Sequence, residues 1–210
     1  MKVLLINGSP HKEGCIYTAL GVVAEAIEKE GIDTNIVWIG NKPIVGCTAC
    51  GHCHKTGSGR CAFGEDGVNA VLDLAEKADG FIFGSAVHYA AATGAITSFL
   101  DRLFYAGGKE IFAHKPGAAV LSCRRSGGTA AFEQLNKYFT ISQMPVVSSS
   151  YWNVVHGHTP DQVRQDLEGM DICRTLGGNM AYMLKCIEAG RAAGILPPQH
   201  PPKAVTNFIR

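Results

Sequence analysis

The chain has 210 residues, of which 46% are hydrophobic and 18% are charged, and its formal net charge is +1. This balance excludes an intrinsically disordered chain, and no apolar run approaches the length of a transmembrane helix. A charge so close to neutral also gives no reason to expect nucleic acid or an anionic membrane as a partner.

A loop between a short apolar run and a helix dominates the start of the chain. Residues 2–6 are typical of a buried parallel strand, and apolar residues recur at helical spacing from 16 to 27. The loop between them offers Ser9, His11 and Lys12, beside the unpaired N–H groups of a helix N-terminus. These groups suit a phosphate. The loop lacks the patterns of a P-loop and of dinucleotide-binding folds, so an ordinary strand–helix turn is the alternative.

A second strand is expected at residues 34–39, and a glycine- and cysteine-rich stretch follows from 40 to 67. Connections this long tend to be functional. No signal sequence is expected, because the N-terminal apolar run is short and is typical of a strand, so the eight cysteines are expected in a reducing cytoplasm. Four of them are close enough in sequence to hold a 4Fe-4S cluster or a zinc ion, with free thiols as the favoured alternative: Cys47, Cys50, Cys53 and Cys61.

The remainder of the chain alternates between short apolar runs and helical patterns. Further strands are expected at residues 80–84, 118–122 and 145–149. Helices are expected around residues 68–75, 96–104 and 132–139, followed by a long helical region at 160–193 with interruptions at Gly169 and at Gly177-Gly178. Two unusual loops follow the third and fourth strands, at residues 85–94 and 123–128.

This alternation predicts an α/β fold, namely a flavodoxin-like five-stranded parallel sheet of order 2-1-3-4-5 with helices on both faces. In that order the loops after the first, third and fourth strands meet at the carboxyl edge of the sheet. A ligand across them would place a phosphate on the first loop and a flat ring against the other two. We expect this domain to span residues 1–195, with a proline-rich, extended tail at residues 196–210.

Three motifs in this order resemble the NADPH-dependent FMN reductase family, which includes the iron–sulfur flavoproteins. They are Gly8-Ser9-Pro10-His11-Lys12-Glu13-Gly14; Gly84-Ser85-Ala86-Val87-His88-Tyr89 with Gly94 and Phe99-Leu100-Asp101-Arg102; and Cys123-Arg124-Arg125 with Gly127-Gly128. Two departures concern the site. Cys15 and Ile16 replace polar residues that are common in the family, and Ala86 replaces a common proline.

The resemblance implies an FMN site built from these three loops. The residues it assigns to the cofactor are Ser9, Pro10, His11, Gly14, Cys15, Ile16, Tyr17, Ser85, Ala86, Val87, His88, Tyr89, Cys123, Arg124, Arg125, Gly127 and Gly128. Within this set, Arg124 and Arg125 are expected to reach the carbonyl edge of the flavin. The alternative for the two arginines is a solvated surface.

The function that the resemblance implies is an FMN-dependent oxidoreductase that takes hydride from NAD(P)H and passes electrons to a small acceptor such as a quinone. No catalytic side chain is assigned, because the flavin carries the chemistry. One alternative is an iron–sulfur flavoprotein that relays single electrons between protein partners. Another is a flavodoxin-like binding domain without turnover.

Three smaller expectations complete the sequence-based description. Asp101 and Arg102 are expected to form a structural ion pair. His156 and His158 are expected at the surface or in contact with a second subunit. The aromatic pair Tyr151-Trp152 and the proline-rich tail favour a homodimer or a higher homo-oligomer.

Overall fold

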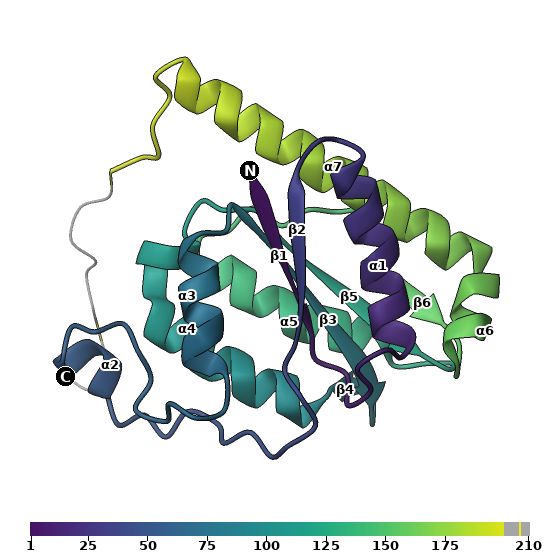
Figure 1. Cartoon of the computed structure of the whole chain (residues 1–210), viewed down its shortest axis with the longest axis horizontal. Helices are drawn as coiled ribbons and strands as arrows, with labels where there is room; N and C mark the ends of the chain where they lie inside the picture. The colour runs from purple at the N-terminus through teal and green to yellow at the C-terminus, as the bar shows by residue number, and fades with distance from the viewer. Residues whose placement is uncertain (200–205, 207–210) are drawn as a thin grey trace.

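Five parallel strands run through the centre of the molecule in the order β2-β1-β3-β5-β6 (Figure 1). This computed structural model describes residues 1–199 and residue 206. The parallel strands are β1 (Lys2–Asn7), β2 (Asp33–Trp38), β3 (Gly80–His88), β5 (Gly117–Cys123) and β6 (Val154–His156). A two-residue strand, β4 (Ala91–Ala92), forms an antiparallel hairpin with the end of β3. The predicted flavodoxin-like order of the parallel strands is confirmed.

Helices cover both faces of this sheet because its strands bury side chains on both sides. Val3, Leu5 and Ile82 pack on one face against α1 (Cys15–Glu28), α6 (Pro160–Gln165) and α7 (Leu167–Ala192). Leu4 and Phe83 pack on the other face against α3 (Val68–Glu76), α4 (Gly94–Phe112) and α5 (Gly128–Ile141). The short α2 (His52–Lys55) lies within the cysteine-rich segment. No helix in the described part of the chain is both long and apolar enough to cross a membrane.

The fifth strand lies later in the chain than the predicted 145–149. Val146 forms only an isolated bridge with Gly117, and regular pairing with β5 begins at Val154. Between them the Ser149 hydroxyl donates to the carbonyl of Tyr151 at 2.7 Å and accepts from its N–H at 3.3 Å. Hydrogen bonds from a serine side chain to nearby backbone groups compete with the hydrogen bonds between strands. Residues 145–149 form only the isolated bridge at Val146, so the predicted fifth strand is wrong.

Two further boundaries differ from the prediction. The third strand does not end at Gly84 but continues to His88, so the predicted second loop contains strand. The C-terminal helical region is divided at Asp166, whose carboxylate accepts the Gly169 N–H at 3.0 Å and begins α7. The predicted interruptions at Gly169 and at Gly177-Gly178 are therefore wrong, since α7 runs through all three glycines.

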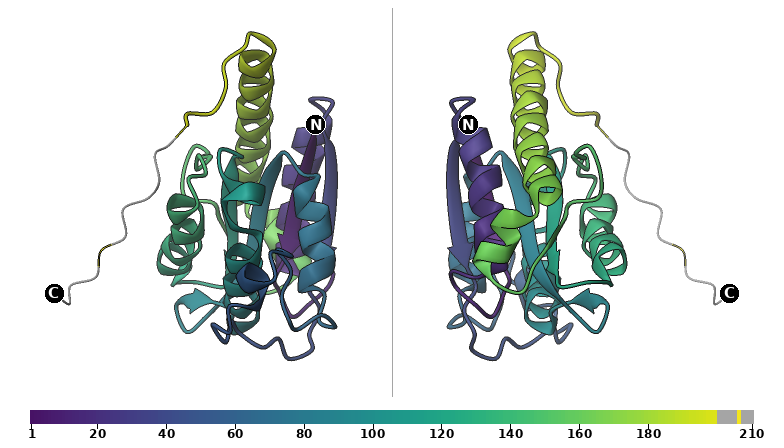
Figure 2. Two further views of the ribbon diagram at one scale, coloured as in Figure 1. Left: turned by 90° about the vertical axis from the view of Figure 1, so that its left-hand side faces the viewer. Right: turned by 90° about the vertical axis from the view of Figure 1, so that its right-hand side faces the viewer.

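The carboxyl ends of the strands gather at one end of the molecule. Figure 2 shows this end at the bottom, with β4 and the cysteine-rich segment nearby, while the last turns of α7 project beyond the opposite end. The loops after β1, β3 and β5 therefore meet as the sheet order requires. In the predicted C-terminal tail, residues 196–199 form no helix or strand, and Pro201 and Pro202 lie outside the described residues.

Candidate functional site

The first loop is shaped by its own side chains. Asn7 is fully buried at the end of β1; its amide donates to the Lys12 carbonyl at 2.9 Å and accepts the Ser9 N–H at 3.0 Å. The Ser9 hydroxyl, almost completely buried, accepts the His11 N–H at 3.2 Å. These bonds fold the loop tightly over the start of α1 and leave Pro10 and His11 exposed.

The start of α1 is open to a ligand. Its N-cap residue, Gly14, provides no side-chain cap, and no acidic residue stands in the first turn. The predicted residues Cys15, Ile16 and Tyr17 form that turn, with Ile16 buried and Tyr17 exposed. A hollow of about 560 Å³ lies over it, lined by residues 10–15, Trp38, Asn41 and residues 158–160. Uncapped N–H groups at the positive end of a helix dipole suit an anion such as a phosphate.

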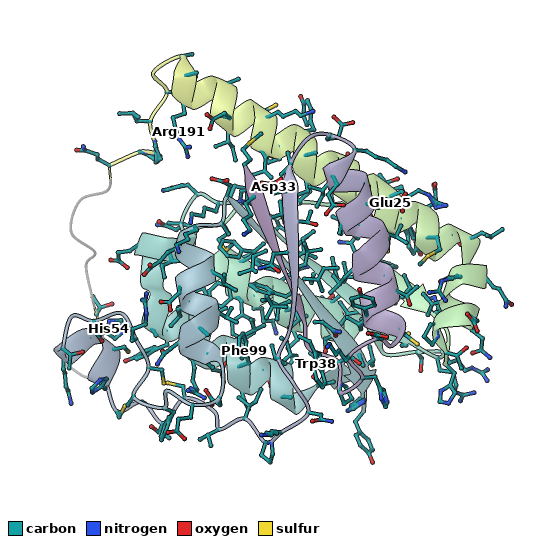
Figure 3. All side chains as sticks on the ribbon, in the orientation of Figure 1. Glu25, Asp33, Trp38, His54, Phe99 and Arg191 are labelled. Carbon is teal, nitrogen blue, oxygen red and sulfur yellow. The ribbon has the colours of Figure 1, made fainter. Side chains whose placement is uncertain are left out.

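Trp38 belongs to this first hollow, although the sequence alone did not indicate it. Its indole N–H donates to the Ser9 carbonyl at 2.8 Å, and Figure 3 labels it at the end of β2. The parallel register places Trp38 beside Asn7, which begins the loop. His158, which the sequence favoured as a surface or subunit-contact residue, also lines the hollow. Trp38 reaches the hollow because β2 pairs with β1, and His158 reaches it because it lies in the turn after β6.

The second loop is tied to the first through Thr93. The Thr93 hydroxyl donates to the Gly8 carbonyl at 3.0 Å and accepts the Ile96 N–H at 3.4 Å as the N-cap of α4. Ser85 is fully buried beneath this contact, where its hydroxyl accepts the Thr93 N–H at 3.0 Å and donates to the Ala86 carbonyl at 2.8 Å. Ser85 therefore supports the loop from below.

The tip of the second loop projects into solvent. Tyr89 is fully exposed with a φ of 50°, and Ala90 also has a positive φ. His88 is exposed, whereas Ala86 and Val87 are half-buried. A positive φ in residues other than glycine is uncommon and marks a conformation that the surroundings impose. The hairpin of β3 and β4 supplies those surroundings here.

The third loop packs directly against the second. Gly127 has a φ of 88°, and a Cβ added to it would stand 2.7 Å from the Ala90 Cα. Gly127 therefore allows the backbone of the third loop to lie close to the hairpin of β3 and β4. Arg124 and Arg125 are both exposed, while Cys123 and Gly128 are buried. Burial raises the pKa of the Cys123 thiol above its ordinary value.

A second hollow, of about 340 Å³, opens beside the third loop. Arg125 and Gly127 line it from the loop, Tyr151 and Trp152 from the segment before β6, and Asp166 from the start of α7. The Asp166 carboxylate accepts the His156 N–H at 2.7 Å, and the His156 ring lies 3.6 Å from the same oxygen. Arg125 lines this hollow, whereas Arg124 is not among its lining residues.

All four cysteines of the segment 40–67 line one small cavity. Cys47 and Cys50 are exposed, Cys61 is half-buried and Cys53 is buried. The His52 N–H lowers the pKa of the Cys50 thiol, whereas burial raises the pKa of Cys53, with a further increase from the charges of Cys61 and Cys47. Among the described residues, no three Cys, His, Asp or Glu side chains form a set that could hold a single metal ion.

The predicted ion pair between Asp101 and Arg102 is wrong. Adjacent helical residues point in different directions, so each finds a partner elsewhere. Asp101 accepts the Tyr138 hydroxyl at 2.5 Å. Arg102 is fully buried and pairs with Asp66, at the end of the cysteine-rich segment.

Comparison with known proteins agrees with this architecture. The model of the NADPH-dependent FMN reductase family matches residues 1–159. An iron–sulfur flavoprotein of Methanocaldococcus jannaschii is 29% identical over 195 residues, which cover 90% of this chain and 100% of the relative.

Two solved structures share the fold. RosB, with a bound 8-demethyl-8-formylriboflavin-5'-phosphate intermediate, matches with a TM-score of 0.69 at 13% identity, covering 100% of this chain and 93% of RosB. A flavodoxin from the domain Archaea matches with a TM-score of 0.58 at 17% identity, covering 88% of this chain and 99% of the flavodoxin. At these identities the two structures bear on the fold alone.

Proposed function

The chain belongs to the NADPH-dependent FMN reductase family, and from this we propose that it binds one FMN at the carboxyl edge of its sheet. The bound flavin would accept hydride from NAD(P)H and pass electrons to a small-molecule acceptor. FMN supplies the redox chemistry when bound, so the protein's own task is binding, orientation and electrostatics.

The observation that carries this proposal is the uncapped start of α1 beneath the first hollow. Backbone N–H groups there lack a side-chain partner, and His11 and Lys12 stand beside them. The Ser9 hydroxyl and the Trp38 indole hold the loop in this shape. A terminal phosphate would occupy this position, which favours FMN over the bulkier FAD.

The second and third loops are the candidates for the flavin ring. They are packed together at Gly127 and Ala90, and exposed His88, Tyr89 and Arg125 project from this pair of loops. An aromatic side chain can stack on the ring, and a guanidinium can donate to its carbonyl edge. The residues would orient the ring and stabilise charge on it, and no side chain acts as an acid, a base or a nucleophile.

A second candidate function is electron relay through an iron–sulfur cluster. The relative from M. jannaschii is named as an iron–sulfur flavoprotein, and the four cysteines line one cavity in this chain. We infer that Cys47, Cys50, Cys53 and Cys61 would hold a 4Fe-4S cluster, which would exchange single electrons with the flavin.

The arrangement of the four cysteines disfavours a single zinc ion. A tetrahedral zinc site holds its sulfurs at about 2.3 Å from the metal, so the sulfurs stand about 3.8 Å from each other. The described cysteines form no such compact set. A multi-iron cluster spreads its thiolates further apart, and apolar Phe63 and Ala106 wall the cavity around them.

Anaerobic purification followed by an absorption spectrum tests both candidates. Flavin bands alone support the reductase, and flavin bands with a broad cluster shoulder support the relay as well. Titration with FMN and FAD should show tighter binding of FMN, since equal affinities would contradict a site closed around a terminal phosphate. Oxidation of NADPH in the presence of a quinone should follow, and a flavin-loaded protein that oxidises neither NADPH nor NADH would contradict the reductase.

A further inference from the structure

Arg102 uses every donor it has. Its side chain is fully buried, and a guanidinium carries five N–H groups. The Nε–H donates to the Cys61 sulfur at 3.1 Å. One terminal nitrogen donates to Asp66 and, at 3.2 Å, to the Val45 carbonyl; the other donates to Asp66 at 3.0 Å and to the Phe63 carbonyl at 2.6 Å.

These acceptors all lie in the cysteine-rich segment. They extend from Val45, two residues before the first cysteine, to Asp66, two residues before α3. The segment has only the four-residue α2 as regular structure, so its shape depends on side-chain contacts. The Phe63 ring, 5.3 Å from the guanidinium carbon, adds a cation–π contact. One arginine on α4 thus anchors both ends of the cysteine site.

The bond to sulfur is separate from the ion pair. Asp66 receives the two-pronged bond that neutralises the buried charge, as carboxylates do with arginine. The Nε–H points instead at Cys61, the cysteine outside the closely spaced C-x-x-C-x-x-C run. Neutralisation of Arg102 does not require this bond, which among the described residues is the hydrogen bond that the Cys61 sulfur accepts.

We propose that Arg102 is the positioning residue of the cysteine site: it presents the Cys61 sulfur as fourth ligand and tunes the reduction potential of the metal group held there. This inference rests on the proposed iron–sulfur cluster. Hydrogen bonds to ligand sulfurs and nearby charge are among the factors that set cluster potentials. A donor and a positive charge beside Cys61 stabilise the reduced, more negative state.

Helix α4 connects this role to the proposed flavin site. The N-cap of the helix, Thr93, donates to the Gly8 carbonyl in the first loop, and Arg102 follows nine residues later. At 1.5 Å per residue, the two contacts are about 14 Å apart along the helix axis. In the view of Figure 3, Phe99 of the same helix lies between Trp38 of the first hollow and His54 of the cysteine segment.

Two variants separate positioning from simple support of the fold. Arg102→Lys keeps the charge but loses the planar fork and the Nε donor. Asp66→Asn keeps Arg102 and removes the negative charge that offsets it. In anaerobically reconstituted protein we expect Arg102→Lys to bind less than half the wild-type iron per FMN, with a more negative potential for the remaining cluster. Asp66→Asn should retain the cluster, with a more positive potential.

The control is Arg60→Lys. Arg60 neighbours Cys61 but pairs with Asp73 and Glu76 at the surface, and none of its described hydrogen bonds reaches a sulfur. The Arg60→Lys variant should therefore keep the wild-type iron content and the wild-type reduction potential of the cluster. Iron and sulfide analysis, redox titration and thermal melting of the FMN-loaded, iron-free forms are the measurements.

The outcomes are distinct. Wild-type iron and potential in Arg102→Lys would overturn the role of Arg102, as would shifts of the same sign in both variants or an equal iron loss in Arg60→Lys. If Arg102→Lys does not fold, two other variants test the proposal. An unshifted cluster potential in Asp66→Asn would overturn it, and so would a wild-type iron content in Cys61→Ala. Wild-type protein that binds FMN but no iron would overturn both the cluster and this role, while leaving the reductase standing.

Discussion

Ser9 is buried in the first loop, and its hydroxyl shapes that loop beside the proposed phosphate position. Ser9→Ala removes the acceptor of the His11 N–H and a polar contact for the phosphate. We expect the variant to bind FMN about 1 kcal/mol more weakly, the usual scale for one hydrogen bond. A fluorescence titration measures this, and an unchanged dissociation constant would remove Ser9 from the site.

The cysteines should differ in reactivity toward an alkylating reagent at pH 8 in metal-free protein. The His52 N–H favours the thiolate of Cys50 by lowering its pKa, and Cys50 is exposed. Burial raises the pKa of Cys173 to about 12, so almost none of it is thiolate at pH 8. Mass spectrometry should find Cys50 modified before Cys53 and Cys173 last. Early modification of Cys173 would contradict the described packing of α7.

Arg125 and Arg124 form a matched pair for the flavin ring. Both are exposed, but only Arg125 lines the hollow beside the third loop. Reduction puts negative charge on the flavin, which a nearby guanidinium stabilises. Arg125→Ala should lower the two-electron potential of bound FMN by about 30 mV or less, because solvent screens an exposed charge. Arg124→Ala is the control, and a redox titration in which neither variant shifts the potential would place the third loop away from the flavin.

At the scale of elements, alanine substitutions of the two adjacent glycines of α7 should have different effects on the stability of the fold. A Cβ on Gly177 would stand 2.6 Å from the Ala26 Cβ of α1 and 2.7 Å from the Val23 carbonyl, whereas a Cβ on Gly178 meets nothing within 4 Å. Gly177→Ala should destabilise the fold by about 1–3 kcal/mol through overpacking. Gly178→Ala should be neutral or stabilise it by up to about 1 kcal/mol through helix propensity. Urea unfolding of both variants measures this, and equal effects would contradict the close α1–α7 contact.

The elements that were predicted well have strong local patterns. The alternation of apolar runs and helical stripes indicated the parallel sheet and its order, since each stripe buries against the sheet. The fifth strand was misplaced because the chain offers two similar valine pairs, Val146-Val147 and Val154-Val155. Only Val154-Val155 lies in regular register with β5, and that register depends on tertiary contacts and not on the local sequence.

The sequence predicts the three loops of the candidate site but not the residues that hold these loops in place. Glycines and polar residues after strands marked the three loops. Trp38 has no local signal, because it enters the first hollow through its register with Asn7. Arg102 was paired with its neighbour Asp101, whereas its partner Asp66 lies 36 residues away in sequence. Contacts of this range depend on the folded chain.

At the scale of the whole molecule, we retain the prediction of a homodimer or higher homo-oligomer. Tyr151 and Trp152 are 60% and 51% exposed beside the second hollow, and Leu167 is 75% exposed at the start of α7. A neighbouring subunit that covered these side chains would border the third loop. Light scattering at micromolar concentration should give at least twice 22.3 kDa, and Trp152→Ser should lower that mass. A wild-type mass of 22.3 kDa would contradict the prediction.

The position of the cysteine-rich segment has a consequence for how the protein matures in the cell. Residues 40–67 follow β2 and precede α3, and none of them belongs to a strand of the sheet. Pairing of the five parallel strands therefore involves no residue of this segment, and we expect the sheet to form without iron. If the segment accepts a cluster, loading is a late step on a finished scaffold, and iron starvation would leave a pool of folded, flavin-only molecules that maturation can later complete.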